Sequence, residues 1–95
     1  MYMTSVTSGE KTASALIITG PCKLSGLQVV AEGADAKVVV QDGVTAAGTV
    51  KCEMTVVNAN KYGGRNWTAP IKFTTGIYVT LTGADASYFV ETLSP

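Results

Sequence analysis

The sequence predicts an all-β fold, namely a single antiparallel β-sandwich of about seven to eight strands with no substantial helix. Short runs rich in β-branched residues recur roughly every 8 to 12 residues, separated by turn residues, which is the spacing of a sandwich or barrel. No segment keeps a 3.6-residue apolar period over the length of a helix. The chain also contains thirteen threonines and twelve valines, whose side chains suit a pleated sheet. These patterns do not determine the strand order, so the expected sandwich is either jelly-roll-like or immunoglobulin-like.

The chain is expected to divide into an extended N-terminal arm, residues 1–12, and one sandwich domain, residues 13–95. The arm is assigned because its residues are small, polar and unpatterned, and we expect it to stay loose until a partner holds it. Turn pairs such as Gly20-Pro21 and Asp42-Gly43 end the runs that follow. Strands are expected at residues 14–19, 22–32, 36–41, 49–57, 68–73, 76–82 and 87–93.

Two of these runs alternate clearly enough to predict which face is buried. Within residues 49–56 the apolar side chains fall on one face, and we expect that face to be core: Val50, Cys52, Met54 and Val56. Within residues 76–82 the same rule places Ile77, Val79 and Leu81 inward.

An internal repeat appears at an offset of fifty residues. Residues 25–40 align without a gap with residues 75–90, and both copies contain Gly-Ala-Asp-Ala, at 33–36 and 83–86. Glycine tolerates positive φ and aspartate bonds to nearby backbone N–H groups, so we expect two matching hairpins, facing each other across the core or placed equivalently in two sheets. A duplicated ligand site is the functional alternative to this turn interpretation.

Size and charge narrow the function. Ninety-five residues make one domain, and the seven basic residues are scattered along a chain of zero net charge, so we expect no nucleic-acid partner. The longest apolar runs reach only about four residues, so no membrane partner is expected. The first ten residues lack the basic and apolar regions of a signal peptide.

Catalysis and cofactors are not expected either. The chain has no histidine, which removes the usual base for a serine or cysteine nucleophile. Neither Cys22 nor Cys52 has a second cysteine or a histidine at the spacing typical of a zinc site. The chain also lacks the Asp-x-Asp cluster typical of a calcium site. We expect the two cysteines to be small buried apolar residues.

The best candidate for contact with another molecule is the segment 57–68, which is expected to be poor in strand. It concentrates Tyr62, Arg65 and Trp67, three residue types enriched at the energetic centres of interfaces. Together with Tyr2 and Met3 of the arm, these are the expected partner-binding residues. The alternative is that Trp67 closes one end of the core while Gly63-Gly64 makes a tight turn.

Three stretches carry a family likeness, at residues 22–30, 33–49 and 70–86. They contain a Gly-Leu-Gln-Val strand, an Asp-Gly turn followed by an Ala/Gly/Thr loop, and Gly-Ile-Tyr-Val-Thr-Leu-Thr-Gly. Over residues 13–92 the chain resembles the small β-sandwich virion proteins of tailed bacteriophages. The resemblance implies a structural protein of the virion without catalytic residues.

Within that class we expect a capsid decoration (cement) protein on the capsid surface, made in the bacterial host cytoplasm. It would bind the major capsid protein, stabilise the head and form a homo-oligomer, with a trimer favoured. One alternative is a structural protein of the tail, neck or head fibre. Another is a carbohydrate-binding adhesion module that uses Trp67 and Tyr62 to stack against sugar rings of a glycan.

Overall fold

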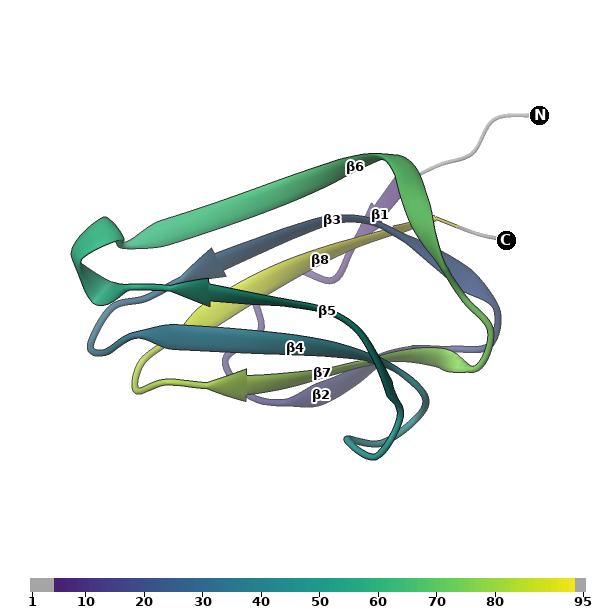
Figure 1. The fold of residues 1–95 in the computed structure, drawn as a ribbon, viewed down its shortest axis with the longest axis horizontal. Helices are drawn as coiled ribbons and strands as arrows, with labels where there is room; N and C mark the ends of the chain where they lie inside the picture. Colours follow the sequence, from purple (N-terminus) through teal and green to yellow (C-terminus); the bar gives the residue numbers. More distant parts are fainter. Residues whose placement is uncertain (1–4, 94–95) are drawn as a thin grey trace.

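Two four-stranded antiparallel sheets face each other in the computed structural model, which describes residues 5–93 (Figure 1). In order across the sheet, sheet 1 contains β1 (Ser5–Thr7), β8 (Ser87–Leu93), β3 (Cys22–Val30) and β6 (Tyr62–Phe73). Sheet 2 contains β2 (Ala15–Thr19), β7 (Gly76–Thr82), β4 (Ala36–Asp42) and β5 (Thr49–Val56). A single 3₁₀ turn, Asn58–Asn60, precedes β6 within the described residues. The predicted all-β sandwich is confirmed.

The strand order is that of a jelly roll. Every connection crosses from one sheet to the other except β4 to β5, which stay in sheet 2. The chain therefore has the connectivity of one long antiparallel hairpin folded around the core. From its closed end to its open end, the paired strands are β4–β5, β3–β6, β2–β7 and β1–β8. This order decides between the two sandwich types that the sequence left open.

The first strand was not predicted, because residues 5–11 lack an alternating pattern and are held through their backbone. The Ser8 N–H donates to the Val90 carbonyl at 2.8 Å, and the Val90 N–H donates to Ser8 Oγ at 2.9 Å. Lys11 and Tyr88 exchange two backbone hydrogen bonds, each of 2.9 Å. The part of the expected arm that the structure describes is thus paired with β8 in sheet 1, while residues 1–4 lie outside the described residues.

The core lies between the sheets and is largest around the central strands. Its largest fully buried side chains are Tyr88, Phe73, Leu24, Leu27 and Ile77. The Tyr88 hydroxyl donates to the Ala13 carbonyl at 2.9 Å, which satisfies its polar end. Burial raises the pKa of Tyr88 to about 12, so the phenol stays protonated across the physiological range.

The expected inward position of Val50 is wrong. Cys52 pairs with Val40 and Val50 pairs with Gln41, so β5 holds one extra residue between these two pairs. Because a one-residue slip moves a side chain to the other face, Val50 lies on the outside of sheet 2 and is 55% exposed. Beyond this bulge the alternation holds, and Val56 is buried while Cys52 and Met54 are half-buried.

The internal repeat corresponds to the four central strands. One copy supplies β3 and β4 and the other supplies β7 and β8, at equivalent central places in the two sheets. The expectation of hairpins is wrong, because each Gly-Ala-Asp-Ala segment carries the chain from one sheet to the other. The two connections lie against each other: a Cβ on Gly83, whose φ is +130°, would stand 2.7 Å from the Asp35 carbonyl oxygen.

Asp42 ties the end of β4 to the turn between β6 and β7. Its carboxylate accepts hydrogen bonds from the Thr75 N–H at 2.9 Å and from the N–H and hydroxyl of Thr74, both at 3.1 Å. A longer bond of 3.4 Å comes from the Gly76 N–H. These donors, that of Thr75 first, lower the pKa of Asp42 below its usual value.

Replacing this carboxylate is expected to weaken the fold in a pH-dependent way. Asp42→Ala should lower the free energy of unfolding by about 1–3 kcal/mol at neutral pH, since hydrogen bonds to a charged group are lost. Because the folded pKa is depressed, the contribution is complete above the unfolded pKa and disappears as the pH falls through the folded pKa. Urea unfolding between pH 7 and pH 2 should therefore show the two proteins converging in acid. Glu10→Ala, at an exposed carboxylate, is the control, and an unchanged difference at every pH would contradict this role.

Truncation tests the pairing of the N-terminal segment. Removing residues 1–12 should lower the melting temperature by several degrees or more, because β1 and the Lys11–Tyr88 bridge are lost from sheet 1. Differential scanning calorimetry of the truncated and full chains measures the effect. A truncation of residues 1–4 alone, which keeps β1, is the comparison. Equal transitions for the full chain and the 1–12 truncation would show that this pairing adds no stability.

Candidate functional site

Three of the five expected partner-binding residues lie on β6. Tyr62, Arg65 and Trp67 all belong to this strand, so the expectation of a strand-poor segment is wrong beyond residue 61. The turn residues that suggested a loop account only for Asn58–Asn60 and the cap at Lys61, whose φ is +70°. Tyr2 and Met3 lie outside the described residues.

A wide bulge in β6 places Trp67. Leu24 pairs with Ile71 and Gly26 pairs with Asn66, so the four residues 67–70 of β6 lie opposite the single residue Ser25 of β3. Figure 1 shows the sharp bend of β6 that goes with it. Such bulges are common at sheet edges and re-aim side chains. Pro70 fits here because β6 is an edge strand.

Arg65 and Trp67 form one unit at the edge of the sandwich where β5 and β6 approach each other. The guanidinium carbon of Arg65 lies 5.4 Å from the centroid of the Trp67 ring, within the range of a cation–π contact. Trp67 is half-buried and packs against the core, whereas Arg65 is exposed. The interpretation that Trp67 closes an end of the core is thus supported, with the Arg65 side chain laid over it.

Tyr62 points away from this unit. Tyr62 pairs with Val30, on the outer face of sheet 1, while Arg65 pairs with Leu27, whose side chain is buried in the core. Tyr62 is 75% exposed. Because the two aromatic rings lie on opposite faces of β6, they do not form one stacking platform for a sugar.

Gly63 and Gly64 make no turn, contrary to the expectation for this pair; both lie within β6. A Cβ on Gly63 would stand 3.0 Å from Val56 Cγ2 and 3.9 Å from Met54 Sδ. The missing side chain therefore lets β5 approach β6 at this edge, and the two sheets close over the core there.

The cysteines offer no activated thiol. Cys22 is buried, and its burial and the nearby Asp42 charge both raise its thiol pKa. Cys52 is half-buried beside the Arg65–Trp67 unit. Burial raises its pKa more than the Arg65 charge lowers it. Both thiols therefore stay protonated at neutral pH.

Sequence reasoning missed a row of cross-strand neighbours on the outer face of sheet 2, three of which are apolar or aromatic. Cross-strand pairing places Val50, Gln41, Tyr78 and Leu16 side by side from β5 to β2, and we call these four residues the Leu16–Val50 row. Leu16 is 43% and Val50 is 55% exposed. No sequence signal marked this row, because the bulge that turns Val50 outward leaves the alternating pattern of β5 unchanged.

Gln41 fixes the loop that borders the row. Its side chain is only 5% exposed, and its amide nitrogen donates to the Ala46 carbonyl at 3.3 Å and to Thr80 Oγ1 at 3.1 Å. The loop between β4 and β5 is thereby held over this end of the sheet. Val44 belongs to this loop and is 44% exposed. Gln41 itself is covered by the loop, so the exposed apolar side chains of the row are Leu16 and Val50.

Other chemistry is sparse in the part of the chain that the structure describes. Residues 5–93 contain no group of three or more histidine, cysteine, aspartate or glutamate side chains placed to hold a metal ion. A polar hollow near the two repeat connections is lined by Thr12, Glu32, Asp85 and Ala86. Among the same residues, no helix has the length and apolar character needed to cross a bilayer.

Because Trp67 packs on the core and Tyr62 is exposed, we expect their replacement to change the free energy of unfolding by different amounts. Trp67→Ala should lower the free energy of unfolding by about 2–4 kcal/mol, because a ring packed on the core is removed. Tyr62→Ala should change it by less than about 0.5 kcal/mol, because that ring is exposed. Denaturant unfolding of both variants measures this, and a cost for Tyr62→Ala equal to that of Trp67→Ala would contradict the assignment of faces.

Comparison with known proteins does not add a family to these observations. No family model matches the chain, and searches of curated proteins and of solved structures find no similar protein.

Proposed function

We propose that this chain is a structural protein of a tailed-bacteriophage virion, a capsid decoration protein that binds the major capsid protein and stabilises the head. The observation that carries the proposal is the pair of exposed apolar side chains, Leu16 and Val50, in the Leu16–Val50 row on the outer face of sheet 2. Apolar patches on one face of a monomer mark protein-interaction sites more often than scattered apolar residues do. The sequence resemblance to virion proteins of tailed bacteriophages is the reason for proposing a phage capsid as the partner.

The surroundings of this surface suit a protein partner. Farther along the outer face of sheet 2, Val39 is flanked by Glu53 and Thr80, and Lys37 forms an ion pair with Glu53 at 3.8 Å. Protein interfaces commonly combine apolar side chains with polar and charged ones at their border. The face also belongs to paired β-strands, so its residues are already ordered and binding requires little further ordering.

The Arg65–Trp67 unit is a second contact region in this proposal. Arginine and tryptophan are the residue types most enriched at energetic centres of interfaces. Because Trp67 already packs against the core, the exposed Arg65 is the part of the unit that a partner can reach. The protein would act as a homo-oligomer, with a trimer favoured, and sedimentation equilibrium of the purified protein measures that state.

Binding to heads that lack this protein tests the proposal. Wild-type protein should co-sediment with undecorated capsids and raise their melting temperature. Val50→Asp places a charge in the apolar surface and should weaken binding by at least about tenfold, since a charge would be desolvated in the interface. Because Val50 is exposed, the isolated variant should melt close to the wild type.

The matched control is Thr55→Asp, an exposed position of the same strand on the same outer face but at its far end. It should bind as the wild type does. Equal binding by the wild type and Val50→Asp would overturn the assigned surface. Failure of the wild type to bind, with antibody labelling of intact virions at the tail, neck or fibre, would favour the alternative structural role. Binding to a bacterial glycan that Trp67→Ala abolishes would favour the adhesion module.

A further inference from the structure

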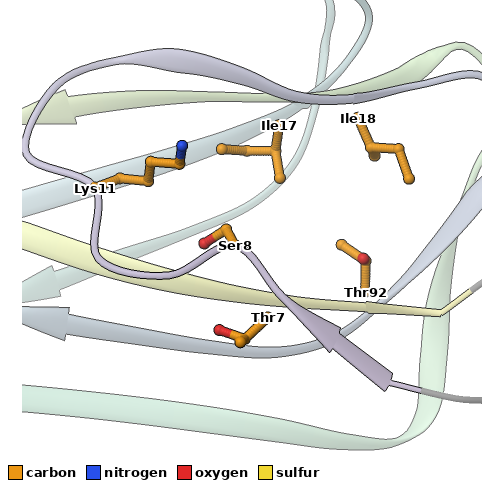
Figure 2. A pocket seen from close by; sticks show the side chains of 6 residues that line it. All are labelled: Thr7, Ser8, Lys11, Ile17, Ile18 and Thr92. Atoms are coloured by element: carbon orange, nitrogen blue, oxygen red, sulfur yellow. The ribbon is translucent and has the colours of Figure 1, made fainter.

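The edge of the sandwich opposite to β5 and β6 is not closed. Between β1 and β2 lies a groove of about 160 Å³, lined by Thr7, Ser8, Lys11, Ile17, Ile18 and Thr92 (Figure 2). β1 is the edge strand of sheet 1 and β2 the edge strand of sheet 2, so the groove lies where the two sheets separate.

A bulge in β2 makes the wall of this groove apolar. Leu16 pairs with Tyr78 and Ile18 pairs with Ile77, so Ile17 is an extra residue on β2. Figure 2 shows both isoleucine side chains projecting toward Ser8 and Thr92 on the other side of the groove. A cavity of about 150 Å³ accepts a group the size of benzene, so this groove has room for one aliphatic or phenyl side chain.

Lys11 supplies the only charge among the residues that line the groove. Its backbone is fixed by two hydrogen bonds to Tyr88, and its half-buried side chain extends along the groove toward Ile17 (Figure 2). Among residues 5–93 no carboxylate lies within ion-pair distance of its ammonium group; the ion pair found there joins Lys37 and Glu53. The groove therefore favours an anionic group next to an apolar one.

The backbone beside the groove is open to a further strand. β1 pairs with β8 on one side and has no neighbouring strand on its other side within the described residues. An edge strand of this kind offers alternate N–H and C=O groups to an extended segment. In an added strand, side chains two positions apart point to the same face.

We propose that an extended segment of another protein adds to β1 as a fifth strand of sheet 1 and is recognised by this groove. One aliphatic or aromatic side chain of the segment fills the space between Ile17, Ile18 and Thr92. An acidic side chain two positions away pairs with Lys11. This inference is independent of the proposed function, because it concerns a different edge of the molecule and does not require the partner to be a virion protein.

Selection from a displayed library of random heptapeptides, with the intact chain as bait, tests the proposal. The expected enriched peptides contain an apolar and an acidic residue two positions apart. Selection on Lys11→Glu should instead enrich a basic residue at the second position. Lys51→Glu makes the same charge change on β5, at the far edge of the sandwich, and should select the same peptides as the wild type.

Affinity and location are measured on the best wild-type peptide. Fluorescence anisotropy should show binding roughly tenfold weaker for Lys11→Glu than for the wild type, because an attraction becomes a repulsion. Amide chemical shifts should change at Thr7, Ser8, Ile17 and Ile18 in the ¹⁵N-labelled protein. If circular dichroism shows that Lys11→Glu does not fold, Lys11→Gln replaces it, with loss of the acidic preference as the expected result.

Several results would overturn the proposal. These are the absence of any enriched motif, the same motif selected on the wild type and Lys11→Glu, or shift changes confined to the Leu16–Val50 row. The last result would show that the peptide binds at the surface that we assign to capsid binding. Failure of capsid binding, in contrast, would leave the peptide result unaffected, so the two proposals fail separately.

Discussion

The apolar contact between the four central strands holds the rest of the molecule in place. β3 and β8 of sheet 1 face β4 and β7 of sheet 2, and these strands supply most of the fully buried side chains. All four come from the internal repeat, whose two Gly-Ala-Asp-Ala connections meet at one end of the sandwich. At the other end Asp42 binds the turn that leads into β7. Because this frame buries its own apolar faces, the four edge strands can carry side chains that the core does not need.

Three of the candidate binding features contain a side chain that a bulge of an edge strand places. The bulge in β2 brings Ile17 to the groove, and the bulge in β5 turns Val50 outward. The longer bulge in β6 places Trp67 at the edge of the core. Bulges also twist an edge away from uncontrolled pairing with other chains. The same local irregularity therefore protects the edges and presents apolar side chains. β1 carries no register shift within its three paired residues, and it is the edge that we assign to strand addition.

The regular parts of this fold could be predicted from the sequence and the irregular parts could not. Residues 76–82 alternate, residues 87–93 form a short run rich in strand-forming side chains, and both follow turn residues, so both strands were predicted with their observed ends. The alternation of apolar and polar residues in β5 does not reveal that this strand has an extra residue opposite β4. The outward position of Val50 was therefore missed. The β1 pairing was missed because it depends on backbone bonds and on the Ser8 hydroxyl. Tyr62, Arg65 and Trp67 were identified by residue type, but their division between two faces follows from pairing with β3.

Amide hydrogen exchange of the isolated protein tests most directly whether a central frame supports more labile edges. The slowest amides should be those of β3, β4, β7 and β8, exchanging only through global unfolding, while β1, β2, β5 and the bulged part of β6 should exchange through smaller local openings. If the edge strands were as strongly protected as the central four, or if the central strands exchanged first, the account would be contradicted.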